Sequence, residues 1–228
     1  PRTDPETSLG IVTDVCLKRK IRNFVELTKE GEAGYNILIK ADKALNTKFT
    51  EAYKELGLKG SGKETPADIQ RQARDYICQN YFDVRTFGAV MSTGDDPCGI
   101  VRGPVQLNFA RSIDTVFAQN ISITRQAKTT EERKKTGDTE MGKKSIIPYA
   151  LYRGEGYVSA MLAQKITGFS EDDLELLWTS IINMFEHDRS AARGKLCVSL
   201  SCSSMTPPWA MPLHISSLTR CQLSSKTA

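Results

Sequence analysis

The segment 83–112 constrains the fold most, because it contains two runs of alternating residues separated by a turn. In the first run, 84–91, both alternating sets are largely apolar, whereas in the second, 105–110, one set is apolar and the other is mostly polar. A period of two is typical of β-strands. The intervening 92–99 contains Gly94, Pro97 and Gly99, which favour a turn. We therefore predict a β-hairpin whose second strand offers a polar face to a ligand.

Composition predicts a water-soluble globular protein without a metal or cofactor. With 228 residues and 39% hydrophobic residues, the chain can form one large domain or two small ones. No apolar run approaches the roughly 20 residues that a membrane span needs. The six cysteines have no C-x-x-C spacing, which favours a reducing, cytoplasmic location. Because the first residue is Pro1, we expect the chain to begin inside a longer reading frame or to have been processed.

Helical periodicity predicts four helices, at 13–25, 41–56, 65–77 and 170–186. The last has the clearest signal, since Ser170 can cap it, acidic residues follow in its first turn, and an apolar stripe runs to Phe185. Short strands are expected at 35–40 and 146–153, and Pro148 should place the second at a sheet edge or in a bulge. Within 115–144, the charged run 129–138 predicts an exposed, mobile projection.

The composition changes near residue 195. Residues 196–228 contain no Asp or Glu and show neither helical nor strand periodicity, so we expect a domain over 1–195 followed by an irregular tail. Reading the tail one nucleotide back turns the codons of Met205 and Thr206 into an Asp codon, and a longer acid-containing segment becomes possible. We therefore expect 196–228 to be translated out of frame.

Basic residues gather in places that suit an anionic partner. The net charge of +4 is small, so such a partner must be argued from local clusters. One cluster lies opposite the apolar stripe of the first helix, and others flank the predicted hairpin and the projection: Lys18, Arg19, Lys20, Arg22, Arg85, Arg102, Arg111, Lys143 and Lys144. Phosphate tracking needs several cations along one face. The same residues could equally form a solvated helix face and salt-bridged strand ends.

Signals for catalysis are weak. His187, at the end of the last helix, can complement the helix dipole or act as a general base, but no partner for a base is evident in the sequence. The hairpin glycines fit no nucleotide-binding spacing. Phe87, Phe109 and Tyr149 could stack on bases or belong to the core.

A set of motifs adds a family resemblance. They are PRTDPET at 1–7, TDVCLKRKIRN at 13–23, DVRTFGAV at 83–90, GPVQ at 103–106, RSID at 111–114, SITR at 122–125, MGKK at 141–144 and FEHDRS at 185–190. In this order they resemble the Cas seven family of the RAMP superfamily, and most closely its Csd-type backbone subunit of type I-C CRISPR surveillance complexes (Cascade). The resemblance covers about 1–195.

The resemblance implies an α+β fold, a modified RNA-recognition (ferredoxin-like) fold with inserted finger and thumb elements, the thumb being the projection at 115–144. It implies a non-catalytic subunit that self-associates into a helical oligomer along the CRISPR RNA, presents this guide to target DNA in antiviral defence, and contacts other subunits of the complex. The family has a strand and a loop before the segment that matches Pro1. We therefore expect a fold that is incomplete at both ends and that is poorly stable alone.

Residue by residue, the resemblance implies RNA contacts in the first helix, the hairpin and the projection. The implied residues are Lys18, Arg19, Lys20, Arg22, Arg85, Gln106, Arg111, Ser112, Arg125, Lys143 and Lys144.

Two other classes of function stay open. A RAMP-type endoribonuclease that processes or cuts CRISPR-related RNA would need a general base, for which His187 is available, and a variant that cuts target RNA would use Asp14. A protein-interaction module would show no salt-dependent affinity for RNA.

Overall fold

A computed structural model describes residues 1–125, 140–191, 193, 196–205 and 218–227. Within these residues the main sheet has seven antiparallel strands in the order β1-β2-β6-β9-β11-β10, with β5 also paired to β9. The strands are β1 (Arg2–Thr3), β2 (Leu9–Val12), β5 (Val105–Leu107), β6 (Ala110–Thr115), β9 (Tyr152–Val158), β10 (Leu196–Met205) and β11 (Leu218–Thr227). This mixed helix and strand architecture confirms the predicted α+β class.

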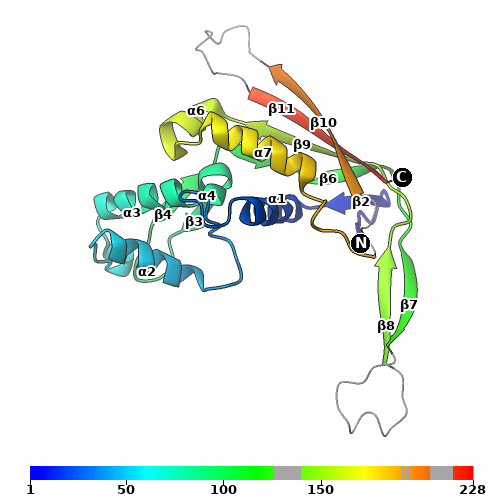
Figure 1. Cartoon of the computed structure of the whole chain (residues 1–228), viewed down its shortest axis with the longest axis horizontal. Helices are drawn as coiled ribbons and strands as arrows, with labels where there is room; N and C mark the ends of the chain where they lie inside the picture. The colour runs from blue at the N-terminus through cyan, green and yellow to red at the C-terminus, as the bar shows by residue number, and fades with distance from the viewer. Residues whose placement is uncertain (126–139, 192, 194–195, 206–217, 228) are drawn as a thin grey trace, which may run out of the picture.

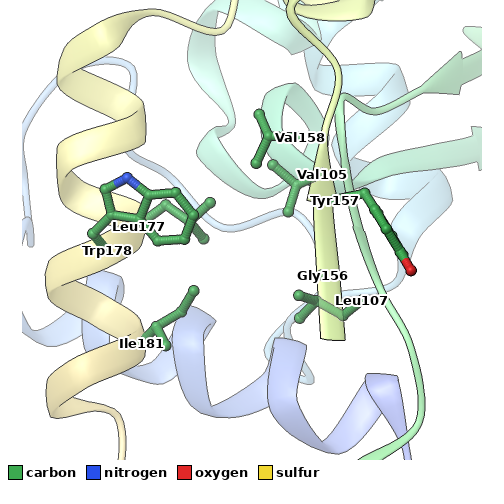
Figure 2. A pocket seen from close by; sticks show the side chains of 8 residues that line it. All are labelled: Val105, Leu107, Gly156, Tyr157, Val158, Leu177, Trp178 and Ile181. Atoms are coloured by element: carbon green, nitrogen blue, oxygen red, sulfur yellow. The ribbon is translucent and has the colours of Figure 1, made fainter. Parts of the chain in front are cut away.

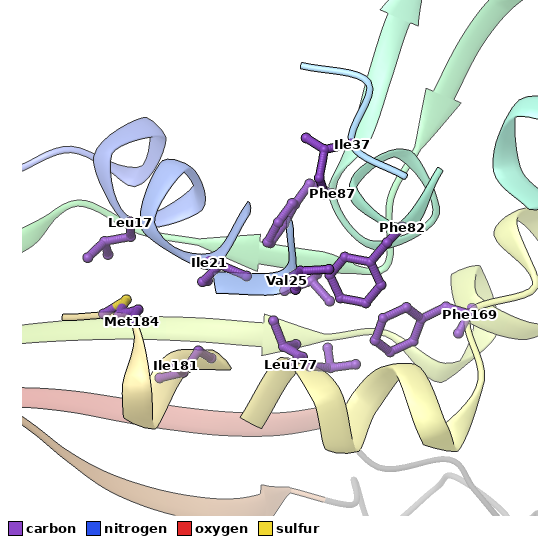
Figure 3. Packing of buried hydrophobic residues seen from close by; sticks show 13 residues of the cluster. Leu17, Ile21, Val25, Ile37, Phe82, Phe87, Phe169, Leu177, Ile181 and Met184 are labelled. Carbon is purple, nitrogen blue, oxygen red and sulfur yellow. The ribbon is translucent and has the colours of Figure 1, made fainter. Parts of the chain in front are cut away.

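Helices α1 (Asp14–Thr28) and α7 (Glu171–Asn183) pack on one face of this sheet. Figure 3 shows Ile21 and Val25 of α1 and Leu177 of α7 converging in the core with Phe82 and Phe169. The α7 N-terminus has a capping box, in which the side chains and backbone N–H groups of Ser170 and Asp173 bond reciprocally. The short helix α6 (Ala160–Leu162) and the π-helical turn η2 (Ala163–Thr167) connect β9 to α7.

A second hydrophobic core lies beside the first (Figure 1). It is formed by α2 (Leu45–Glu55), α3 (Ala67–Asn80), β3 (Gly88–Met91) and β4 (Gly99–Arg102), and a short 3-10 turn, η1 (Gly62–Glu64), precedes α3. Helix α4 (Phe82–Phe87) joins the two cores, since Phe82 and Phe87 belong to the first and Val84 to the second.

The predicted hairpin of 84–91 with 105–110 is wrong. Residues 82–87 are helical, β3 pairs with β4, and β5 pairs with β9 instead. All six residues of α4 are buried, and its polar side chains are ion-paired or, at Thr86, hydrogen-bonded to the backbone, so the segment imitates a buried strand. Gly88 ends the helix at φ +77°, and a Cβ there would lie 2.4 Å from the carbonyl oxygen of Val101.

The other predicted elements differ in outcome. The helices expected at 13–25, 65–77 and 170–186 correspond to α1, α3 and α7, and the one expected at 41–56 begins only at Leu45. The strand expected at 35–40 is reduced to a single bridge between Asn36 and Tyr81. The strand expected at 146–153 is wrong, because β8 (Glu140–Ile146) ends and β9 begins on either side of Pro148.

Within the described residues, the segment that we expected to be an irregular tail contains two strands. β10 and β11 pair over their full length, and β11 pairs with β9, so the sheet continues beyond residue 195. Val198 packs against the first core. The origin of this segment in a shifted reading frame stays a prediction.

Strands β7 (Gln119–Arg125) and β8 form a separate two-stranded ladder that projects away from the sheet (Figure 1). This ladder occupies the predicted projection, whose charged run 129–138 lies outside the described residues. No helix in the described part of the chain is long and apolar enough to cross a membrane.

Candidate nucleic-acid interface

The basic run of α1 is divided between buried and accessible residues. Lys20 and Arg22 are 9% and 8% exposed, and their charges are paired with Asp188 at 2.6 Å and Asp83 at 2.8 Å. Lys18 is half-buried and pairs with Asp14 at 3.0 Å, one turn earlier on the helix surface. Arg19 is also half-buried and has no ion pair with a described residue. Lys18 and Arg19 are therefore the members of this run that are not fully buried, although only 15% of the Lys18 side chain is exposed.

Arg85 lies inside the protein, where a phosphate group cannot reach it. It is 8% exposed, and its Nε and Nη2 donate to the two carboxylate oxygens of Asp173, each at 2.7 Å. Its Nη1 donates to the backbone carbonyls of Gly34, Cys78 and Gln79. Because these bonds use all three guanidinium nitrogens, Arg85 joins α3, α4 and α7 inside the protein.

An aromatic ring packs against the middle of α1. The Lys18 Nζ and the Arg22 Cζ lie 5.5 and 5.4 Å from the centroid of the Phe87 ring, within the range of cation–π attraction. Phe87 itself is only 6% exposed, so it supports cations rather than stacking on bases.

The backbone after β4 passes close to the end of α4, next to Phe87. A Cβ on Gly103 would lie 2.2 Å from the carbonyl carbon of Phe87, so the chain after β4 passes directly against the end of α4. Arg102, whose Cα is paired with that of Gly88, is exposed. We call Lys18, Arg19 and Arg102 the α1 patch.

The predicted residues of β5 and β6 lie on two faces of the sheet. Ser112 is 3% exposed on the helix side, where its Oγ accepts from the Gly10 N–H at 2.8 Å and donates to the Asp114 carbonyl at 2.6 Å. Arg111 and Gln106 are exposed on the opposite face. Arg111 pairs with Asp4 at 3.0 Å. The Glu6 backbone N–H, followed by Arg111, lowers the pKa of the Asp4 carboxyl.

The projecting ladder carries its own cations. Lys143 and Lys144 are exposed, and they lie opposite Ser122 and Ile121 in the register of β8 with β7. Because they are consecutive in a strand, their side chains point to opposite faces of the ladder. Arg125 ends β7, and its side chain lies outside the described part of the structure.

The structure therefore distributes the predicted residues over the α1 patch, the sheet face opposite α1 and α7, and the β7–β8 ladder, and it buries Lys20, Arg22, Arg85 and Ser112. Sequence reasoning missed Arg153, which is exposed on β9 directly opposite Arg111. The sequence signal that could have identified it is the run 152–158, in which Arg153, Glu155 and Tyr157 alternate with two glycines as in a β-strand.

No catalytic constellation is evident among the described residues. His187 is exposed and lies beside Phe24, with ring centroids 6.1 Å apart, and Asp14 is engaged by Lys18. Burial raises the pKa of the Cys78 thiol to about 11 and that of Cys98 to about 12, which keeps both protonated. Within the described residues, no group of His, Cys, Asp and Glu side chains could hold a metal ion.

A small pocket between α7 and strands β5 and β9 is apolar (Figure 2). Its lining carries no charged side chain: Val105, Leu107, Gly156, Tyr157, Val158, Leu177, Trp178 and Ile181. It is therefore a gap in the first core rather than a site for a nucleic acid.

Comparison with known proteins gives the family. One chain of a solved structure described as "CRISPR RNA-guided surveillance complex, pre-nicking" is similar, with 14% identity over 89% of this chain and 71% of the other, and a TM-score of 0.48. No curated protein sequence matches. The family model described as CRISPR-associated protein Cas7 matches residues 1–204, which is most of the 228 residues. The chain therefore belongs to the CRISPR-associated protein Cas7 family.

Proposed function

We propose that this chain is a non-catalytic backbone subunit of a CRISPR surveillance complex that grips the CRISPR RNA by its phosphates. Family membership supports the class of protein. The observation that carries the RNA contact is the α1 patch: Lys18 lies over the Phe87 ring, its neighbour Arg19 is partly exposed, and Arg102 is exposed on β4. Copies of the chain would self-associate along the guide and present it to target DNA beside other subunits, in the cytoplasm, as in a type I-C, Csd-type complex.

The basic residues fall into two groups, those that would contact RNA and those that hold the helices in position. Lys20, Arg22 and Arg85 are each paired with a carboxylate, which is buried for Arg22 and Arg85, so they hold α1 and α4 in place rather than binding phosphate. Lys143 and Lys144 on the projecting ladder, together with Arg125, would extend the RNA path beyond the α1 patch.

The chemistry of the patch suits a guide whose sequence varies. Lysine and arginine contacts to phosphate carry no sequence information and release condensed counterions, so affinity depends on salt rather than on base identity. A subunit that serves guides of any sequence needs this kind of contact.

Replacing Lys18, Arg19 and Arg102 together with glutamine is expected to weaken binding of unrelated RNA sequences about equally. Each lost phosphate contact lowers the slope of log affinity against log salt by about 0.7 for a single strand, so the triple variant should lose about two units of slope. Filter binding over a salt series measures it, and the bound RNA should be recovered intact, whereas an endoribonuclease would shorten it.

The matched control replaces Lys54, Lys59 and Lys63 with glutamine, which removes the same charge from exposed positions on and after α2. Its salt slope should stay close to the wild-type value. A wild-type slope in the patch variant would contradict the assignment of these three residues.

A further inference from the structure

Among the described residues, Lys18 is the member of the α1 patch whose charge is held by a carboxylate. The Lys18 Nζ lies 3.0 Å from the Oδ2 of Asp14, and only 15% of the Lys18 side chain is exposed. The Phe87 ring also contacts this ammonium group, with its centroid 5.5 Å from the Nζ. A phosphate that binds Lys18 must therefore reach a cation that already has an anionic partner.

The pair of Lys18 with Asp14 is local and lies at the surface of α1. Asp14 is in the first turn of the helix, and residues four apart in a helix are neighbours on its surface. The Asp14 side chain is 24% exposed, so solvent reaches the carboxylate. Ion pairs that water and salt can reach contribute little free energy. This pair can therefore be exchanged for a stronger anionic partner of Lys18.

The pair of Arg22 with Asp83, on the same helix, cannot be exchanged in this way. The Asp83 side chain is fully buried, and its carboxylate also accepts from the backbone N–H groups of Leu38 and Ile39. An incoming phosphate would have to enter the core to replace it. Of these two ion pairs of α1, only the one with Asp14 presents its carboxylate to solvent.

A phosphate group and the Asp14 carboxylate compete for the same ammonium group, because both are oxygen anions that accept from it. Binding of RNA by Lys18 therefore includes the cost of separating Lys18 from Asp14. Breaking a surface ion pair lowers an affinity by up to about fivefold. Repulsion between the released carboxylate and the bound phosphate lowers it further, by a factor of about five when the two charges are about 4 Å apart in water.

We propose that Asp14 is a competitor built into the α1 patch, which occupies Lys18 in the free protein and is displaced when an RNA phosphate binds. This inference rests on the proposed function and deepens it, because it names the residue that limits the affinity of the same site. Asp14 weakens all guides equally, since it competes with a phosphate and not with a base. The wild-type protein therefore binds RNA less tightly than the three cations of the patch allow.

The test measures the affinity of the full chain for fluorescent oligouridylate at low salt, by fluorescence anisotropy. Replacing Asp14 with asparagine should strengthen binding about fivefold, because asparagine has a similar shape but leaves Lys18 without a competing charge. A structural role predicts the opposite sign, since an acidic residue in the first turn stabilises the helix. Replacing Asp14 with glutamate should leave the affinity within about twofold of wild type, because a carboxylate four residues before Lys18 can still pair with it.

A double-variant cycle links the effect to Lys18. Replacing Lys18 with glutamine should weaken binding, and adding the Asp14→Asn change to this variant should alter the affinity by less than about twofold, because no ammonium group remains for Asp14 to occupy. The matched control is Glu26→Gln, which removes the same charge from α1 about 12 Å further along the helix than Lys18. Glu26 pairs with Lys40, and its variant should bind within about twofold of wild type.

Three results would overturn the inference: Asp14→Asn binds oligouridylate no more tightly than wild type, its gain persists in the Lys18→Gln background, or Glu26→Gln gives an equal gain. If the wild type binds with salt dependence and Lys18→Gln weakens binding, but Asp14→Asn brings no gain, the inference fails and the proposed function stands. Wild-type protein that shows no salt-dependent binding of oligouridylate would contradict the proposed function, and the inference with it.

Discussion

Replacing Asp173 with alanine is expected to lower the free energy of unfolding by about 3–5 kcal/mol, because the Arg85 charge would stay buried without its partner. Asp173 is 2% exposed and accepts two hydrogen bonds from Arg85, each at 2.7 Å. It also accepts from the Ser170 N–H at 3.0 Å, so the substitution removes half of the capping box of α7. Denaturant unfolding measures the change.

Asp172 provides a matched control for this substitution. It is the preceding residue in the first turn of α7 and is exposed, so its replacement by alanine should cost only about 0.3–1 kcal/mol through the helix dipole. Equal losses for the two variants would show that the pair of Arg85 with Asp173 contributes little to stability.

Replacing Asp83 with alanine should lower the free energy of unfolding by a similar amount, about 3–5 kcal/mol, because it also breaks a buried ion pair. Asp83 is fully buried, and its carboxylate accepts from the Arg22 Nε at 2.8 Å and from the backbone N–H groups of Leu38 and Ile39 at 2.8 and 3.1 Å. Unfolding in denaturant gives the loss of stability. Hydrogen exchange should also become faster at the amides of Leu38 and Ile39.

The control is Asp75, an exposed residue of α3 whose Oδ1 lies 3.7 Å from the Nε of its neighbour Arg74. Its replacement by alanine should change stability by less than about 1 kcal/mol, as for other surface ion pairs. The account of Asp83 fails if its variant unfolds at the same denaturant concentration as the Asp75 variant.

Elements with local signals could be predicted from the sequence. Helix α7 begins where Ser170 and Asp173 bond each other, three residues apart, so its start is encoded within one turn. The amphipathic faces of α1 and α3 are likewise local properties, since one apolar stripe defines each helix.

The segment 82–87 could not be assigned in this way, because long-range contacts decide its structure. Arg85 is 88 residues from Asp173 in the chain, and Arg22 is 61 residues from Asp83. A short helix that is buried on all sides shows no polar face, so its pattern is indistinguishable from that of a buried strand. Ion pairing also explains why three of the predicted RNA contacts are buried, at Lys20, Arg22 and Arg85.

The strands β10 and β9 were missed although a signal existed. Leu196, Val198 and Leu200 alternate with small residues, which is the period of two that a strand shows. The absence of Asp and Glu from the same segment favoured an irregular tail instead. In β9 the glycines at 154 and 156 made the alternation weak that places Arg153 on the sheet face opposite α1 and α7. Its pairing with Arg111 depends on sheet topology, which the sequence does not display.

The central claim is that this Cas7-family chain binds RNA along the phosphate backbone, and the nucleic acid that copurifies with it tests the claim most directly. The full-length reading frame would be expressed together with a CRISPR array, purified at low salt, and its nucleic acid extracted and sequenced. We expect RNA of one length class that maps to the array, is degraded by ribonuclease but not by deoxyribonuclease, and is released as salt increases. Protein that emerges free of nucleic acid at low salt, or that carries only DNA, would contradict the account.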